Sequence, residues 1–280
     1  MPPNVRWCLK SHIVSMIQII KAELNDVTPL RVDYLNSLPE FQELYLEIFI
    51  DNSDIYKIYF NDILIGYVIK TVDNILVEFY LIDRFIPNCN DVFQTIIKDL
   101  AINTIYCKSF DSLLLSCCLT NSYTYKLFGT LFRDYVDSER IAINDLSIRF
   151  AENKDYSFLL QQEGELYETP DELEKYVNGN NVIMFQKDSQ LLGCGYLIKV
   201  HANYDYYDIG MWVNPNYRKQ GIATLIISYL KDTCLKNSWK PICGCAIENI
   251  ASQKTLEKNG FVSKHKIIEF KVNNKNAPNT

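Results

Sequence analysis

The sequence predicts an α/β (α+β) protein built from two similar units in tandem, each a mixed, mostly antiparallel twisted sheet flanked by helices. Short runs of alternating apolar residues, typical of half-buried strands, are interspersed with apolar residues at helical spacing. Each half contains a hairpin whose turn is a pair of short polar residues, Asn61-Asp62 and Asp188-Ser189. The elements also follow the same order in both halves, which favours a tandem duplication over coincidence.

Composition narrows the class of protein. The chain has 280 residues, of which 48% are hydrophobic and 22% charged, as in a globular protein long enough for two domains. A net charge of -6 argues against bulk binding to nucleic acid or to an anionic membrane. We interpret the nine cysteines as free thiols in a reducing compartment. No histidine stands at a metal-ligand spacing from a cysteine, so we expect no metal site.

The first residues show no secretory signature, and the apolar stretch 13–20 is too short to cross a bilayer. We therefore expect a cytoplasmic protein with no membrane segment. Met16 directly precedes a strand-like run, so residues 1–15 are interpreted as an N-terminal extension and Met16 as an alternative start.

The first unit is expected to span residues 16–135 and to be followed by a linker at 136–145. Its expected strands cover 17–21, 55–60, 63–70 and 75–81. Its expected helices cover 28–38, 40–49, 91–100 and 123–132, and the apolar run 112–119 is strand-like.

The second unit is expected to span residues 146–272, followed by a frayed tail at 273–280. Its expected strands cover 146–150, 182–186, 191–200, 204–213, 242–247 and 267–272. Its expected helices cover 155–167, 170–178, a segment starting at 222, and 250–258. Thr169-Pro170-Asp171-Glu172 predicts the start of one helix by its capping box, and Asn259-Gly260 predicts the end of another.

The segment Arg218 to Ala223 is the strongest functional signal. It follows a strand ending at Val213-Asn214-Pro215 and opens an amphipathic helix. A helix N-terminus offers unpaired N–H groups and a positive dipole end, and Gly221 lets an anion approach the backbone. Arg218, Lys219, Lys231 and Lys236 are expected to form a basic patch beside this turn, which suits a diphosphate.

Two blocks together resemble the GNAT superfamily of acyl-CoA-dependent N-acyltransferases. The first is Val213-Asn214-Pro215 followed by Arg218-Lys219-Gln220-Gly221-Ile222-Ala223. The second contains Asn249, Ser252 and Glu257-Lys258-Asn259-Gly260-Phe261. The resemblance spans 146–272 and, in weaker form, 16–135. It implies an N-acetyltransferase that moves the acetyl group of acetyl-CoA to a primary amine by direct attack within a ternary complex.

The resemblance also implies which residues contact the co-substrate. Backbone amides from Lys219, Gln220, Gly221, Ile222 and Ala223 would hold the CoA diphosphate, with Arg218 at the rim. In the family the preceding strand carries a bulge and splays from its neighbour, so that pantetheine pairs with Met211, Trp212 and Val213. An N–H there, of Met211 first, would stabilise the oxyanion. Asn249 and Ser252 match positions that touch the cofactor arm.

The attacking amine must lose a proton, which requires a carboxylate or a chain of ordered water. Asp208 on the central strand is the first candidate base, and Glu248 the second. A solvated or cross-strand-paired carboxylate explains either residue equally well. Many members place a tyrosine acid where this chain has Leu256. Either Ser252 or water replaces the tyrosine as the general acid, or the leaving thiolate needs no acid. Leu256 itself is interpreted as a residue that packs in the core.

The first unit lacks the phosphate turn, since residues 83–90 contain no glycine. We therefore expect the first unit to bind no CoA. We expect it instead to cover an edge of the second unit or to shape its acceptor cleft.

The acceptor is expected to be a small-molecule amine or a peptide or protein amine. An acidic, aromatic wall would suit a cation, although a solvated helix face explains the same residues: Tyr156, Glu163, Glu165, Tyr167, Glu168, Asp171, Glu172 and Glu174. His201, Tyr204, Tyr206 and Tyr207 are either cleft-lining or surface aromatics.

Two alternatives stay open. One is a transferase of the same fold that uses a bulkier acyl-CoA. The other is a CoA-binding pseudoenzyme or sensor, motivated by Leu256 and by the unassigned base. The oligomeric state is not determined by the sequence.

Overall fold

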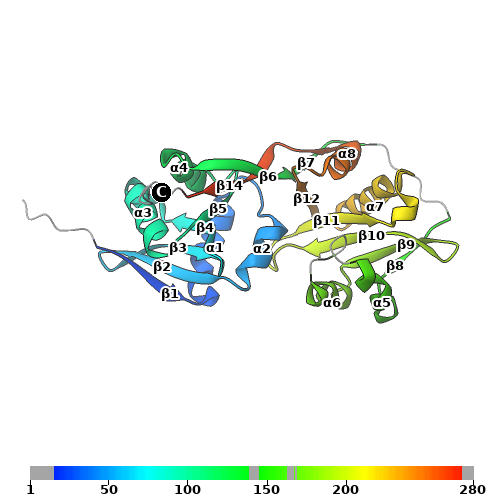
Figure 1. Cartoon of the computed structure of the whole chain (residues 1–280), viewed down its shortest axis with the longest axis horizontal. Coiled ribbons are helices and arrows are strands. Elements are labelled where there is room, and N and C mark those ends of the chain that lie inside the picture. The colour runs from blue at the N-terminus through cyan, green and yellow to red at the C-terminus, as the bar shows by residue number, and fades with distance from the viewer. Residues whose placement is uncertain (1–15, 139–144, 163–166, 168, 273–280) are drawn as a thin grey trace, which may run out of the picture.

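The computed structural model describes residues 16–138, 145–162, 167 and 169–272. These residues form a twelve-stranded sheet with helices on both faces and a separate two-stranded ribbon. The strand order of the large sheet is β1-β2-β3-β4-β5-β14-β6-β12-β11-β10-β9-β8. Figure 1 shows the two halves side by side along the long axis, the first at the left. The predicted tandem α/β fold with a mixed, mostly antiparallel sheet is confirmed.

The first half contains strands β1 to β7 and helices α1 to α4. The strands are β1 (Ile17–Ala22), β2 (Asp54–Phe60), β3 (Ile63–Lys70), β4 (Ile75–Leu81), β5 (Thr104–Lys108), β6 (Thr124–Phe132) and β7 (Asp134–Tyr135). The helices are α1 (Leu24–Ser37), α2 (Leu44–Ile50), the 3-10 helix η1 (Asp83–Asn88), α3 (Cys89–Asp99) and α4 (Ser112–Thr120).

The second half repeats this order. Its strands are β8 (Ser147–Phe150), β9 (Val182–Lys187), β10 (Gln190–Lys199), β11 (Tyr206–Val213), β12 (Lys240–Ala246), β13 (Phe261–Val262) and β14 (His265–Lys271). Its helices are η2 (Asn153–Asp155), α5 (Tyr156–Leu159), η3 (Leu160–Gln162), α6 (Pro170–Asn178), η4 (Pro215–Tyr217), α7 (Ile222–Lys236) and α8 (Ile250–Lys258).

Both predicted hairpin turns are present. The turn residues have positive φ in each case, 48° and 64° at Asn61-Asp62 and 50° and 64° at Asp188-Ser189. Such paired left-handed residues match the twist of the flanking strands, and Asn and Asp tolerate this backbone region better than most residues. Helix α6 begins as predicted, because the Thr169 side chain accepts a hydrogen bond from the Glu172 amide.

The two halves exchange strands. Strand β14, at the end of the second half, lies between β5 and β6 in the sheet of the first half. Strand β6 in turn pairs with β12, from Phe132 opposite Cys243 to Gly129 opposite Ala246. The small strand β7 pairs with β13 of the second half. Each half therefore covers a strand edge of the other, as the sequence analysis expected for the first unit.

Each half also contains one pair of adjacent parallel strands that pair over only two or three residues and then diverge. Strands β4 and β5 pair only at Ile75–Thr104 and Leu76–Ile105. Strands β11 and β12 pair at three positions, the last joining Asp208 and Ile242. Beyond these positions the strands diverge, and an open wedge between two central strands is a common place for a ligand.

Three expected elements were wrong. The run 112–119, with Cys117-Cys118, is helix α4, because Asp111 caps its first turn and Leu114, Cys117 and Cys118 bury one face at helical spacing. The expected helix at 123–132 is strand β6, because two strands flank it. The expected helix at 155–167 is reduced in the described residues to α5 with a 3-10 turn on each side.

Several expectations lie outside the described residues. These are the extension 1–15, linker positions 139–144, the tail 273–280, and Glu163, Glu165 and Glu168. Within the described residues, no helix has the length and apolar character needed to cross a membrane.

The buried side chains form clusters on the two faces of the sheet. In the first half, one cluster centres on Phe79 and Phe93 beneath α3 and α4, and a second on Tyr67 and Leu46 beneath α1 and α2. The second half has corresponding clusters beneath α7 and α8 and beneath α5 and α6. A small fifth cluster joins Phe41 of the first half to Val200 and Ile242 of the second, so the two halves share a core.

Candidate functional site

The turn before α7 has the backbone that an anion site needs. Gly221 has φ of +82°, and a Cβ built on it would meet nothing within 4 Å. Lys219 is also left-handed, with φ of 63°. Positive φ at two positions turns successive amides toward one side, and glycine adopts such φ at no steric cost. The residues from Arg218 to Gly221 are exposed, so the turn is open to solvent.

Helix α7 begins directly after this turn. Its N-cap is Gly221, and no side chain caps it. Its first amides therefore lack the intrahelical partners that later residues have. The Arg218 Nε donates to the Val213 carbonyl oxygen at 3.2 Å, which holds the arginine stem against the end of β11.

The expected basic patch is smaller than predicted. Lys231 is buried, and its Nζ donates to the carbonyl oxygens of Asn259 at 2.8 Å and Val136 at 3.2 Å. Lys231 therefore joins Val136, where the segment that connects the two halves begins, to Asn259 at the end of α8. Arg218 and Lys219 remain beside the turn.

The backbone of β11 presents an open edge toward β12. The Asn214 amide donates to Leu192, and the Tyr206 carbonyl oxygen accepts from Val200, so even-numbered residues point toward β10. In an antiparallel ladder the N–H and C=O of one residue face the same neighbour. Met211 and Val213 therefore turn their backbone groups to the opposite side, where β12 has already diverged.

The expected bulge in β11 is absent from its ladder with β10. The pairing runs without a shift from Gly193 opposite Val213 to Lys199 opposite Tyr207, and the register shift lies instead between β9 and β10. The divergence of β11 from β12 therefore arises without a bulge on that side. The Trp212 side chain lies on the face of the sheet covered by α5 and α6, opposite to Met211 and Val213. It is 4% exposed there and packs with Cys194 and Leu173.

Asp208 is the one carboxylate of the central strand. Its Oδ1 is buried and has no hydrogen-bond partner among the described residues, although the residue as a whole is only partly buried. Burial raises the pKa of Asp208 well above its usual value, and the nearby Glu43 raises it further, whereas Arg133 opposes the change. A carboxylate in this environment is well suited to hold a proton.

Glu43 and Arg133 both come from the first half. The Arg133 Nη2 forms an ion pair with the Glu43 carboxylate at 2.5 Å. Its Nε donates to the Phe41 carbonyl oxygen at 3.0 Å, and its Nη1 to that of Cys243 on β12 at 3.1 Å. A Cβ at Gly244 would lie 2.7 Å from Glu43 Oε1, so the carboxylate rests directly on the β12 backbone.

The remaining predicted residues lie around the start of α8. The Asn249 side chain caps this helix by accepting from the Ser252 amide at 3.0 Å. The Ser252 side chain lies close to the thiol of Cys245 on β12, where it opposes the rise in the pKa of that thiol caused by burial. Glu248 is exposed in the turn between β12 and α8. Leu256 is 1% exposed in the core beneath α7 and α8, which is the packing role that the sequence analysis considered.

The aromatic residues around β11 connect the halves. The Tyr206 ring stacks on Phe41 of the first half, and the Tyr204 ring also contacts Phe41, with centroids 5.0 Å apart. The Tyr204 hydroxyl donates to Asn36 at 3.0 Å. Tyr207 points to the other face and stacks on Trp239. The sequence did not reveal Phe41, Glu43 and Arg133, because nothing local marks a residue whose partners lie in the other half of the chain.

The expected acidic wall is only partly described. Tyr167 is buried in the core beneath α5 and α6, so it packs instead of lining a surface. Asp171 and Glu174 are exposed on α6, whereas the Glu172 carboxylate accepts from the Tyr176 hydroxyl at 2.7 Å. These described residues fit a solvated helix face with one local hydrogen bond.

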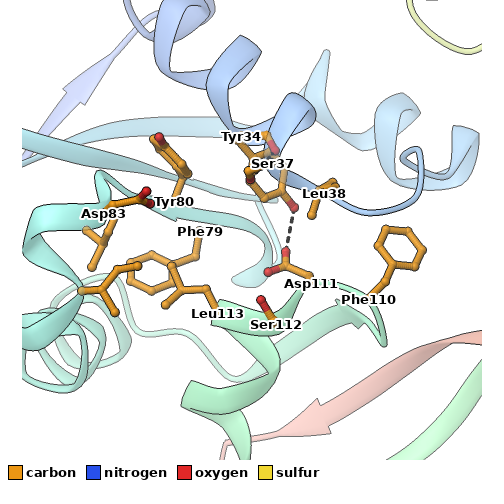
Figure 2. A pocket seen from close by; sticks show the side chains of 12 residues that line it. Tyr34, Ser37, Leu38, Phe79, Tyr80, Asp83, Phe110, Asp111, Ser112 and Leu113 are labelled. Carbon is orange, nitrogen blue, oxygen red and sulfur yellow. Dashed lines mark hydrogen bonds between the residues drawn. The ribbon is translucent and has the colours of Figure 1, made fainter.

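The first half holds a pocket of about 150 Å³ where β4 and β5 separate. Figure 2 shows the Tyr34 hydroxyl pointing across it to Asp111, to which it donates at 2.8 Å. Ile86 of η1 and the carboxylates Asp83 and Asp111 also line the pocket. Helix η1 occupies the place of the glycine-containing turn, and the carboxylates would repel a diphosphate. This lining therefore suits an uncharged or cationic ligand better than a diphosphate, and the expected failure of the first half to bind CoA stays a prediction.

A buried polar network lies beside this pocket. Glu78 is fully buried and accepts from Arg31 at 3.0 and 3.1 Å and from the Tyr67 hydroxyl at 2.9 Å. The Lys108 Nζ donates to the Tyr34 hydroxyl at 2.7 Å. Burial opposes ionisation of Glu78, yet Arg31 outweighs it and the pKa of Glu78 is lowered. Arg31 is paired with both Glu78 and Glu47, and the Lys108 ammonium is hydrogen-bonded to Tyr34 and Gln42, which is typical of a structural network.

Family models match both halves of the chain. A model described as an acetyltransferase (GNAT) domain matches residues 23–135. A second, described as the acetyltransferase (GNAT) family, matches residues 143–261. No curated protein matches the sequence significantly.

Three solved structures are similar over nearly the whole chain. An acetyltransferase of the GNAT family from Colwellia psychrerythraea is 21% identical with a TM-score of 0.83, and the match covers 92% of this chain and all of that one. A GCN5-related N-acetyltransferase from Sphaerobacter thermophilus is 11% identical with a TM-score of 0.62, covering 91% and 95%. A tandem GNAT protein from the clavulanic acid biosynthesis pathway is 9% identical with a TM-score of 0.60, covering 92% and 98%. At these identities the likeness shows the fold.

Proposed function

Since this chain belongs to the GNAT acetyltransferase family, with one such domain in each half, we propose that its second domain transfers the acetyl group of acetyl-CoA to a primary amine. The observation that carries the proposal is the open turn at Gly221, set between the diverging edge of β11 and the uncapped start of α7. In the first domain this position holds η1, which has no glycine.

The residues of the second domain fit acyl-CoA as a substrate. Backbone amides at Lys219 to Ala223 would hold its diphosphate, with Arg218 at the rim. The exposed edge of β11 at Met211 and Val213 can pair with an extended amide-containing arm as a further strand does. An amide of this edge, with Met211 the first candidate, stabilises negative charge on the thioester oxygen during attack.

Asp208 is the proposed proton acceptor. It lies three residues before Met211, about 10 Å along the strand at 3.3 Å per residue. A proton therefore passes from the acceptor ammonium to Asp208 through water, and the neutral amine attacks the thioester carbon. The C–N bond forms, the C–S bond breaks, the nitrogen gives up its second proton to water, and the CoA thiolate leaves and takes up a proton. Gly210 lies between the two positions on the Asp208 face and contributes no side chain there, and its neighbour across the ladder is Tyr196.

This chain has no tyrosine at the position from which many GNAT members protonate the leaving thiolate. Leu256 fills that position within the core. The proposed proton source is either Ser252, which lies close to Cys245 near the end of β12, or water. Glu248 is exposed and is the second candidate base. A missing general acid slows such a reaction by about 10²–10⁴-fold without abolishing it.

Thermal melting with CoA and thiol release from acetyl-CoA together test this proposal. A ligand that binds only the folded protein raises the melting midpoint. We expect a CoA-dependent rise for the wild type and none for Gly221→Glu, which adds bulk and negative charge at the turn. Gly210→Ala, on β11 away from the turn, is the matched control. An equal rise in Gly221→Glu and the wild type would refute the site.

Thiol release with a panel of primary amines separates an enzyme from a CoA-binding pseudoenzyme, which Leu256 makes a real alternative. We expect amine-dependent release. A CoA-dependent melting shift without release from either acetyl-CoA or longer acyl-CoAs would favour the pseudoenzyme, and release from the longer thioesters alone would favour a bulkier acyl group.

A further inference from the structure

A segment of the first domain covers the central strands of the second. Phe41 stacks on Tyr206 of β11 and shares a buried cluster with Ile242 of β12. Side chains two residues apart on a strand lie on the same face. Asp208 therefore lies on the face that Phe41 covers, beside its ladder partner Ile242, and Gly244 follows on that face of β12. Glu43, two residues after Phe41, rests on Gly244.

The charges at this contact do not balance. Asp208 and Glu43 are two carboxylates, and the Glu43 carboxylate is paired with the single guanidinium of Arg133. The third titratable neighbour is the Cys243 thiol, which stays neutral because burial, and then Asp208, raise its pKa well above the usual value. One negative charge is therefore left over when both carboxylates are ionised.

An unpaired hydrogen-bond acceptor also lies at this contact. Asp208 Oδ1 is the one buried side-chain oxygen or nitrogen without a partner among the described residues. Leaving such an atom unpaired is unfavourable, so native structures keep one where water, an ion, a ligand or a bound proton satisfies it. A hydrogen-bond donor carrying a positive charge would satisfy both the unpaired oxygen and the excess charge.

We propose that Glu43 and Arg133 of the first domain form part of the acceptor site of the second, and that the Asp208–Glu43 carboxyl pair receives the protonated amine of a cationic acceptor. Arg133 holds Glu43 in place, and Asp208 accepts the proton of the ammonium through water. The acceptor class is thus a primary ammonium, and the catalytic unit is the tandem pair of domains. This inference rests on the proposed transferase function.

The absence of a side chain at Gly244 supports this arrangement. A Cβ there would displace the Glu43 carboxylate, which lies at 2.7 Å from the Cβ position. Arg133 meanwhile reaches the backbone of both domains, at Phe41 and at Cys243. Glu43 is therefore held between the β12 backbone and a guanidinium that itself bonds the backbone of both domains.

The first test titrates the carboxyl groups and needs no acceptor. Isotope-labelled carboxyl carbons of aspartate and glutamate are followed by NMR against pH, with Asp208→Asn identifying the Asp208 signal. We expect Asp208 to titrate at lower pH in Glu43→Gln than in the wild type, because a neighbouring negative charge is removed. Glu40→Gln, which removes the same charge three residues earlier, should leave it unchanged. Identical Asp208 titration in Glu43→Gln and Glu40→Gln would overturn the proposal.

The second test measures transfer to the best amine of the panel. In Glu43→Gln we expect the KM for the amine to rise about tenfold, the factor that corresponds to 1.4 kcal/mol, with an unchanged CoA-dependent melting shift. Glu43→Asp, which keeps the charge, should recover part of the loss, and Glu40→Gln should behave as the wild type. If Glu43→Gln does not fold, Gly244→Ala displaces the carboxylate with all charges retained and should raise the same KM.

The outcomes separate the two proposals. Absence of both CoA binding and thiol release in the wild type would refute the transferase function, whereas the titration would still decide whether the carboxyl pair exists. Wild-type transfer with equal KM values in Glu43→Gln, Gly244→Ala and Glu40→Gln would refute the role of the first domain and leave the transferase standing.

Discussion

The ring of Phe41 lies parallel to that of Tyr206, with centroids 4.2 Å apart and planes inclined by 4°. Phe41 precedes α2 in the first domain, and Tyr206 begins the central strand of the second. The contact therefore fixes the first domain directly against the strand that carries Asp208. It also explains why the two domains share a buried cluster in addition to a continuous sheet.

Phe41→Ala should destabilise the whole chain. The side chain is 4% exposed, and deleting a buried phenyl ring costs about 3–5 kcal/mol because a cavity remains. Urea unfolding measured by both fluorescence and circular dichroism checks the value and shows whether the domains still unfold together. Phe158→Ala, at a ring 40% exposed on α5, is the matched control and should cost far less. Equal losses in the two variants would contradict the interface.

A fragment of residues 146–280 should not be a stable, active enzyme. Without the first domain, β12 loses its partner β6, and β14 loses both β5 and β6. Unpaired strand edges promote aggregation. Solubility, melting and thiol release of the fragment test this, and co-expression with residues 1–145 is the control that should restore them. A soluble fragment with full activity would show that the strand exchange is dispensable.

The parts of the fold that the sequence predicted correctly are those set by local chemistry. Asn61-Asp62 and Asp188-Ser189 specify their turns through residues that tolerate positive φ, and Thr169 specifies the start of α6 through its side chain. The Gly221 turn was found in the same way, since a glycine before an amphipathic helix is visible within a few residues.

The parts that were missed depend on distant contacts. Strand β6 is held by β14 and β12, more than a hundred residues away, so its own composition does not distinguish strand from helix. Arg133 bonds Cys243 across 110 positions and Glu43 across 90. No periodicity or motif reports such a pairing, so Asp208 was predicted as a base while its neighbours from the first domain were not.

Asp208→Asn should change the pH dependence of stability. The folded-state pKa of Asp208 is raised, first by burial and then by Glu43. Its contribution to stability is therefore fully present below the unfolded-state pKa and is lost as pH rises through the folded-state pKa. The variant cannot ionise, so its stability relative to the wild type should increase with pH by about 1.4 kcal/mol per unit of pKa difference.

Urea unfolding of both proteins at several values between about pH 4 and pH 8 checks this expectation. Glu248→Gln is the control, because this side chain is exposed. Curves for Asp208→Asn and the wild type that stay parallel throughout would show that the Asp208 carboxyl is not perturbed in the folded protein.

Glu78→Gln tests the opposite case, a buried carboxylate that is fully paired. Glu78 is 0% exposed, and the substitution leaves Arg31 buried with Glu47 as its remaining ion-pair partner. Breaking a buried pair costs about 3–5 kcal/mol.

The loss should depend on pH. Burial opposes ionisation of Glu78, but Arg31 and Lys108 outweigh it and lower the pKa of Glu78. The contribution of Glu78 to stability is therefore present above the unfolded-state pKa and is lost as pH falls through the folded-state pKa. Urea unfolding should therefore show a large loss at neutral pH that shrinks in acid. Glu174→Gln, exposed on α6, should lose little at any pH, and a loss for Glu78→Gln that does not vary with pH would contradict the assigned ionisation.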